Sequence, residues 1–392
     1  MRTRFFLPLA LAATLFTAQP VFSQNIPELI RQGNAASTAR NFSAAAQIFR
    51  TIISIEPNNA YAYTSLGFAL EQQGNLEEAI TNYRTSIRLD PNDAFAYNNL
   101  GIALRQQGNL AEAITNYRTA IRIDPNYVYS YTSLGNALRQ QGNLAEAITN
   151  YRTAIRLDPI NANAHNSLGF ALYDQGNLEE AMSNYRTAIS LDPNNSLAYN
   201  GMGLALRQQG NLEKAITNYR TAISLDPNNS LAYYNLGIAL RQEGNLAEAI
   251  TNYRTSIRLD PNNTLAYDNL GNALSDQGNL EEAITNYRTA IRLDPNDAGV
   301  YYNLGLALRQ QGNLADAIAN YRTAIRLDPN DAYAYNGLGY VLARQGNLTE
   351  AINNYRTALR LNPNRTPDEN NLQTSIQNNL REAERRLAEQ RR

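Results

Sequence analysis

The sequence contains no cysteine, no tryptophan, one histidine (His165) and one lysine (Lys214). Without cysteine there can be no disulfide, thiolate nucleophile or Cys/His zinc site. A lone imidazole does not build a catalytic or metal constellation, and His165 replaces a tyrosine that recurs before and after it, so we interpret it as a packing substitution. We therefore expect no enzyme activity, no metal and no cofactor.

Charge of either sign is not in excess, because 34 basic and 35 acidic side chains give a formal net charge of -1. Nucleic-acid binding depends largely on neutralising phosphates with a surplus of Lys and Arg. We therefore expect no nucleic-acid partner. Hydrophobic residues make up 43% and charged residues 18% of the chain, which is typical of a folded globular protein.

The first 23 residues have the pattern of a signal peptide. Arg2 and Arg4 precede an apolar run over 5–16, and residues 21–23 suit a signal peptidase, which predicts cleavage after Ser23. The apolar run has about 12 residues, whereas a bilayer-spanning helix needs about 20. We expect an exported bacterial protein, periplasmic or extracellular, with no stable membrane span after signal removal. The alternative is an uncleaved N-terminal anchor.

Proline recurs every 34 residues from Pro57 to Pro363, and a glycine recurs in step from Gly33 to Gly339. This period divides the chain into ten units without insertion or deletion, and residues 366–392 follow them. The predicted units are 26–59, 60–93, 94–127, 128–161, 162–195, 196–229, 230–263, 264–297, 298–331 and 332–365.

Each unit has the pattern of two antiparallel helices. In 60–93 the first apolar stripe includes Tyr63 and Leu70, at helical spacing. Gly74 can close this helix, and we expect Asn75 to cap the next one, with Glu78 as its capping-box partner. Pro91 ends the second helix. One such hairpin buries only one face, so stability must come from stacking successive units.

A glycine inside the first helix costs about 1 kcal/mol relative to alanine, so it needs a structural reason. We expect Gly67 and Ala79 on the second helix to let the two helix axes approach closely. Tyr83 and Ser86 then fill the space against the next hairpin.

These residues resemble the tetratricopeptide repeat (TPR) family, whose 34-residue pattern is W-x2-L-G-x2-Y, then A-x3-F, then P. In 60–93 the matching residues are Tyr63, Leu66, Gly67, Leu70, Ala79, Tyr83 and Pro91. The resemblance covers 26–365 and implies an all-α fold, a right-handed α-solenoid of ten hairpins. The first repeat departs most, with Gln32, Arg40 and Phe49 at pattern positions, and we interpret it as a polar N-terminal cap.

The segment 366–392 begins as a helix with a proline and two acids in its first turn. Leu372, Ile376, Leu380 and Leu387 form its apolar stripe. We interpret it as a capping helix over the last repeat, and a short dimerisation arm is the alternative.

Repeat positions that hold the same residue in every unit are used for stacking, whereas positions that vary from unit to unit, here called variable columns, are available for function. The variable columns lie in the first helix. The resemblance implies that the second, fifth, sixth, ninth, twelfth and thirteenth positions face a ligand-binding groove. The fifth and sixth positions hold the asparagines Asn98, Asn99, Asn166, Asn200, Asn235, Asn269, Asn303 and Asn336. Such amides can bind a peptide backbone, and the sixth-position members resemble the asparagine ladder in the repeats of O-linked N-acetylglucosamine transferases, whose catalytic domain is absent here. The alternative is that asparagine is merely a tolerated polar residue.

Three more columns carry apolar or basic side chains. The second position includes Tyr61, Phe95, Tyr129, Leu197, Leu231, Leu265 and Tyr333, and the ninth includes Phe68, Ile102, Phe170, Leu204, Ile238, Leu306 and Tyr340. An exposed apolar stripe marks a partner site, although these residues could instead pack between neighbouring helices. The twelfth position holds Arg105, Arg139, Arg207, Arg241 and Arg309, a mild bias toward an acidic partner.

We therefore expect a non-enzymatic scaffold that binds a protein or an extended peptide in the groove. The alternative is an architectural envelope protein whose uniform surfaces stack into a homo-oligomer.

Overall fold

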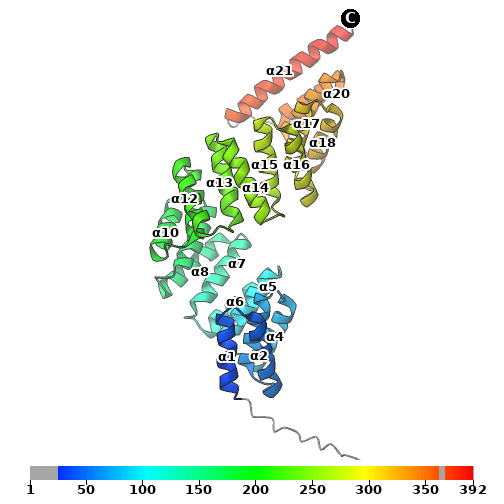
Figure 1. Ribbon diagram of the computed structural model, residues 1–392. Helices are drawn as coiled ribbons and strands as arrows, with labels where there is room; N and C mark the ends of the chain where they lie inside the picture. Colours follow the sequence, from blue (N-terminus) through cyan, green and yellow to red (C-terminus); the bar gives the residue numbers. More distant parts are fainter. Residues whose placement is uncertain (1–24, 362–366, 392) are drawn as a thin grey trace, which may run out of the picture. The chain divides into compact units, whose positions relative to one another are not determined.

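The computed structural model describes residues 25–361 and 367–391, and within them all regular structure is α-helix (Figure 1). The predicted signal peptide, residues 1–23, lies outside the described residues. Helices alternate between two roles, the first and the second of each repeat, here called A helices and B helices.

The A helices carry odd numbers. They are α1 (Ile26–Thr38), α3 (Ala60–Gln72), α5 (Ala94–Gln106), α7 (Val128–Gln140), α9 (Ala162–Asp174), α11 (Ser196–Gln208), α13 (Ser230–Glu243), α15 (Thr264–Gln277), α17 (Ala298–Gln311) and α19 (Ala332–Arg344).

The B helices carry even numbers. They are α2 (Phe42–Ile55), α4 (Leu76–Leu89), α6 (Leu110–Ile123), α8 (Leu144–Leu157), α10 (Leu178–Leu191), α12 (Leu212–Leu225), α14 (Leu246–Leu259), α16 (Leu280–Leu293), α18 (Leu314–Leu327) and α20 (Leu348–Leu361). The last helix, α21 (Pro367–Gln390), follows α20.

The described residues form two compact units that meet in sequence between residues 159 and 160, so that the described helices divide into α1–α8 and α9–α21. Within each unit a B helix packs against the A helix of its own repeat and against the next A helix. Successive helices run antiparallel (Figure 1). The predicted all-α fold of stacked helical hairpins is confirmed.

The tight turn between the two helices of a repeat uses one glycine and one asparagine. Gly108 has φ +90° with no atom within 4 Å of an added Cβ, so its backbone conformation is the constraint. Asn109 Oδ1 then accepts the backbone N–H of Glu112 (3.3 Å), and its Nδ2 donates to Glu112 Oε2 (2.8 Å). The capping box predicted at Asn75 is wrong for that repeat, because Asn75 makes no side-chain cap and Glu78 pairs with Arg50.

In the first repeat Arg40 stands where the others have this glycine, and its φ is +56°. A left-handed conformation costs an L-residue about 1–2 kcal/mol, a strain that glycine avoids. We expect Arg40→Gly to raise the free energy of unfolding by about 1 kcal/mol, measured by urea denaturation. Gly108→Ala should lower it by a similar amount, and a destabilised Arg40→Gly protein would contradict this account.

The core is organised around one tyrosine in each of nine B helices, and each of these side chains is at most 2% exposed. They are Tyr83, Tyr117, Tyr151, Tyr185, Tyr219, Tyr253, Tyr287, Tyr321 and Tyr355. A Cβ added to Gly67 would lie 2.7 Å from Tyr83 Cε1. The glycine in the A helix therefore makes room for the ring of its own repeat's tyrosine, and not principally for Ala79 as the sequence predicted.

Helix α21 packs against α20 and α19 and covers the end of the last repeat. Leu372, Ile376 and Ala383 are buried, at 8%, 0% and 1% exposure. Arg356 of α20 forms an ion pair with Glu384 of α21 at 2.8 Å. These contacts support the interpretation of α21 as a capping helix.

Candidate functional site

Within each unit the variable positions lie on the A helices. The second, fifth, sixth, ninth, twelfth and thirteenth positions of each repeat are here called the A-helix face. Its most exposed apolar side chains are those at the second position. Their exposed fractions lie between 44% and 65%. They are Tyr61, Phe95, Tyr129, Leu197, Leu231, Leu265 and Tyr333. Ninth-position side chains such as Phe68 and Ile102 are half-buried.

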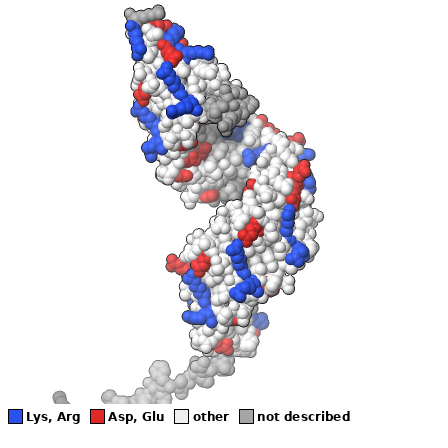
Figure 2. Space-filling view, turned by 180° about the vertical axis from the view of Figure 1, so that it is seen from behind, with Lys and Arg blue, Asp and Glu red and all other residues white. Residues whose placement is uncertain are grey.

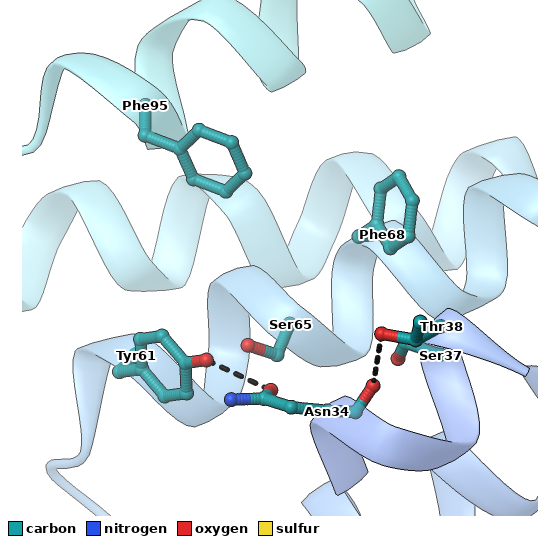
Figure 3. A pocket seen from close by; sticks show the side chains of 7 residues that line it. All are labelled: Asn34, Ser37, Thr38, Tyr61, Ser65, Phe68 and Phe95. Atoms are coloured by element: carbon teal, nitrogen blue, oxygen red, sulfur yellow. Dashed lines mark hydrogen bonds between the residues drawn. The ribbon is translucent and has the colours of Figure 1, made fainter. Parts of the chain in front are cut away.

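One pocket on this face, of about 310 Å³, lies in the N-terminal unit (Figure 3). Three helices contribute to it, and every residue lining it occupies an A-helix-face position. They are Asn34, Ser37 and Thr38 of α1, Tyr61, Ser65 and Phe68 of α3, and Phe95 of α5.

Hydrogen bonds and ring contacts hold the walls of this pocket in place. Tyr61 Oη donates to Asn34 Oδ1 at 2.8 Å, which joins α3 to α1 (Figure 3). The Tyr61 ring also meets Phe49 of α2 edge-on, with 6.4 Å between ring centroids. Phe68 contacts Phe42 in the same manner at 6.1 Å. The aromatic side chains that line the pocket are thus held in place by Phe42 and Phe49 of α2. Hydroxyl and amide groups also line it.

The α1 contribution was missed at the sequence level, because the first repeat was interpreted only as a cap. Asn34, Ser37 and Thr38 occupy the ninth, twelfth and thirteenth positions of that repeat. Applying the same columns to the first repeat would have found them.

Several asparagines of the fifth and sixth positions link neighbouring helices through their side chains. Asn235 Nδ2 donates to Asn200 Oδ1 of the preceding repeat at 3.0 Å, and both residues are buried. The sixth position of one repeat thus faces the fifth position of the one before it. Further links join Asn269 to Tyr234 (3.2 Å), Asn303 to Asp268 (3.0 Å), Ser130 to Asn98 (3.4 Å) and Asn379 to Asn336 (3.2 Å).

The expectation that these amides stand free in a groove is therefore wrong for the buried members. Asn98, Asn99, Asn166, Asn200 and Asn235 are at most 8% exposed. Packing between neighbouring A helices covers them, and a peptide backbone lying on the surface would not reach their amides without displacing that packing. Asn269, Asn303 and Asn336 are half-buried and retain some accessible surface.

The twelfth-position arginines are half-buried, and several lie against groups of the chain itself. Arg241 pairs with Asp276 of the next repeat at 2.8 Å, and the Arg309 guanidinium lies 4.9 Å from the centre of the Tyr340 ring. Burial raises the pKa of Tyr117 to about 12, and the positive charge of Arg105 partly offsets this. The buried tyrosine therefore remains a neutral phenol.

Two carboxylates on the A-helix face are also engaged. Glu71 accepts hydrogen bonds from Tyr83 Oη (2.9 Å) and Gln106 Nε2 (3.2 Å), and burial raises its pKa. Asp268 accepts from Asn303 (3.0 Å) and Asn272 (3.2 Å), and burial raises its pKa as well. Glu71 of α3 thus links to α4 and α5, and Asp268 of α15 links to α17.

His165 lies half-buried, with Nδ1 3.2 Å from Asn184 Oδ1. Across the described residues there is no group of three or more His, Cys, Asp or Glu side chains that could hold a metal ion. In the same residues no helix has both the length and the apolar character needed to cross a bilayer.

Comparison with known proteins identifies the family. The family model described as the Cilia and flagella-associated protein 70 C-terminal domain, a TPR domain, matches residues 158–376, more than half of the chain. The TPR repeat model matches residues 72–104, 101–138 and 135–176, and a tetratricopeptide repeat model matches 48–81. The chain therefore belongs to the tetratricopeptide repeat family, whose stacked hairpins generally serve as non-catalytic scaffolds for protein interaction.

Individual proteins similar to this chain were also found. A TPR repeat-containing protein of Picosynechococcus sp. (strain ATCC 27264 / PCC 7002 / PR-6) is 47% identical over 47 residues, which are 12% of this chain and 12% of that protein. The crystal structure of a tetratricopeptide repeat protein from Parabacteroides merdae ATCC 43184 aligns with TM-score 0.52 and 18% identity, covering 64% of this chain and 98% of that one. The APC/C hetero-tetramer Cut9-Hcn1 aligns with TM-score 0.49 and 15% identity, covering 92% of this chain and 96% of that one.

Proposed function

We propose that this protein is a non-enzymatic scaffold that binds an extended peptide segment of a partner protein along its A-helix face. The observation that carries the proposal is the row of half-exposed apolar side chains at the second position of successive repeats. Exposed apolar side chains that lie on the same side of neighbouring helices often mark a binding site. Because these residues occur in seven of the ten A helices, including three in a row in α3, α5 and α7, they suit a ligand that runs across several helices.

We assign the α1/α3/α5 pocket as the anchor site for one apolar side chain of that peptide. Its volume of about 310 Å³ is at the lower end for ligand pockets and holds a side chain of leucine or phenylalanine size. Burying such a side chain contributes about 1.5–3 kcal/mol. The hydroxyls of Ser65 and Thr38 also line the pocket, where they can hydrogen-bond to the peptide backbone.

The pocket can be tested with peptides selected from a random displayed library against the wild-type protein. We expect the Tyr61→Ser, Phe95→Ser double variant to bind a selected peptide at least about tenfold more weakly, which corresponds to about 1.4 kcal/mol. Fluorescence polarisation with the labelled peptide measures this. Ile55→Ser is the matched control, because Ile55 is 45% exposed at the end of α2 and lies outside the A-helix face. Equal affinity of the double variant and the wild type would remove the pocket from the site.

We further propose that the protein acts outside the cytoplasm, as a periplasmic or extracellular bacterial protein, because residues 1–23 have the signal-peptide pattern. The intact mass of the protein recovered from an envelope or culture fraction tests this. Cleavage after Ser23 is expected, and a full-length, membrane-retained chain would indicate the anchor alternative.

Self-assembly is the alternative function, since similar repeat surfaces could stack. Light scattering coupled to size-exclusion chromatography separates the two. The scaffold proposal expects a mass independent of protein concentration, whereas a mass that grows with concentration would favour an architectural role.

A further inference from the structure

A ladder of ion pairs joins successive repeats through their B helices. An arginine of one B helix pairs with a glutamate 28 residues later, in the next B helix or, for Arg356, in α21, with N–O distances of 2.6–2.9 Å. The pairs are Arg50–Glu78, Arg84–Glu112, Arg118–Glu146, Arg220–Glu248, Arg254–Glu282, Arg322–Glu350 and Arg356–Glu384. All are partly exposed, and Figure 2 shows basic and acidic side chains lying next to each other in short stripes.

One step of this ladder has its charge reversed. Arg186 of α10 is the arginine of the fifth repeat, and the residue 28 positions later is Lys214 of α12, the only lysine of the chain. Both side chains are exposed. Among the described residues neither forms an ion pair or a side-chain hydrogen bond, so two cations occupy a register that holds an arginine and a carboxylate in the pairs above.

We propose that Arg186 and Lys214 form a carboxylate-binding site for an acidic segment of a partner protein. In the pairs above, the arginine binds a glutamate of the chain itself. At this step Lys214 stands in the place of that glutamate, so a carboxylate for Arg186 has to come from another molecule. Arginine can bind both carboxylate oxygens through its planar fork, while lysine adds a second, compact positive charge. This site is on the B helices and is independent of the A-helix face.

A single exposed ion pair contributes little to affinity and is screened by salt. The site therefore acts as one contact of a larger interface and fixes the position of the partner along the repeats. Its location is specific, because Asp316 stands 28 positions after Arg288 at the equivalent step of a later repeat. Arg288 and Asp316 carry opposite charges, although no ion pair joins them in the described structure. Because these charges cancel, we expect no acidic segment of a partner to bind at that step.

The probe for this site is fluorescein-labelled hexaglutamate, titrated by polarisation against the full mature chain at low ionic strength. We expect one bound peptide per chain for the wild type and at least tenfold weaker binding to Lys214→Glu. The same variant should also melt at a higher temperature than the wild type, because the introduced carboxylate can pair with Arg186. Asp316→Glu is the matched control and should leave hexaglutamate binding unchanged.

A gain of binding tests the same idea in the opposite direction. Glu112→Lys places a lysine opposite Arg84 and should raise the number of bound hexaglutamate peptides from one to two. Equal binding to the wild type and to Lys214→Glu would overturn the proposal, as would absence of binding to the wild type. Displacement of hexaglutamate by inorganic phosphate at equal concentration would overturn the assignment to a protein carboxylate.

Discussion

Replacing Gly203 by leucine should lower the free energy of unfolding by about 3 kcal/mol or more, the upper range for overpacking a well-packed core. A Cβ added at this position would lie 2.5 Å from Tyr219 Cε1 and 2.8 Å from Cδ1. Tyr219 is fully buried, so its ring cannot move into solvent. The improved helix propensity of leucine offsets only about 1 kcal/mol of this loss.

Thermal and urea unfolding followed by circular dichroism measure the effect. Gly299→Leu is the matched control, because Gly299 also lies in an A helix but is exposed, and a Cβ there meets only Asp297 Oδ1 at 3.2 Å. We expect the control to be near neutral or stabilising. Equal destabilisation by both variants would mean that the glycine column is not needed for the tyrosine rings.

Replacing Asn235, Asn269 and Asn303 together by alanine should also lower the free energy of unfolding, by about 2–3 kcal/mol. The full penalty applies at the buried Asn235, and a smaller one at the half-buried Asn269 and Asn303. Each change removes a donor and leaves its partner in the preceding repeat without that hydrogen bond, and a buried unsatisfied group costs about 1–3 kcal/mol. The partners of Asn235 and Asn303 are Asn200 Oδ1 and Asp268 Oδ1. The three links share no acceptor, so their effects should add approximately.

The matched control is the triple alanine variant of Asn228, Asn262 and Asn296, which are exposed asparagines in the turns between repeats of the same part of the chain. Their backbone N–H groups, and not their side chains, donate to the aspartates two residues earlier. The control should unfold at nearly the wild-type urea concentration. A triple variant of Asn235, Asn269 and Asn303 that is as stable as this control would show that the amide links contribute nothing.

The sequence was sufficient to predict the fold because the signals repeat. A proline, two glycines and the apolar stripes mark the same places in nearly every unit, and each signal has a local cause. Gly108 is required by its positive φ, and the helix following it starts at an asparagine cap. Such local rules can be read without knowing how neighbouring repeats pack.

The candidate site was predicted less well, because it depends on distances between repeats. Tyr61 and Phe95, two of the predicted second-position side chains, are exposed and line the pocket, and their role in binding stays a prediction. The asparagines lie on the A helices as predicted. However, Asn200 and Asn235, from two adjacent repeats, hydrogen-bond to each other and are buried. Period and residue type do not show whether a polar side chain turns toward solvent or toward the next helix.

The charge ladder illustrates the same limit. The sequence shows arginines and glutamates on the B helices but does not show which of them pair. Only the structure shows that Arg84 reaches Glu112 of the next repeat at 2.7 Å. Lys214 is unusual because it stands where a glutamate pairs with the arginine at the paired steps of the ladder. The residues next to it in the sequence do not show this.

The central claim is that a peptide lies across the A helices. Hydrogen exchange measured by mass spectrometry tests it most directly, using the wild-type protein with and without a selected peptide that contains no acidic residues. We expect slower exchange in α1, α3 and α5 when the peptide is bound, with little change in α2, α4 and α6. Protection confined to the even-numbered helices would contradict it.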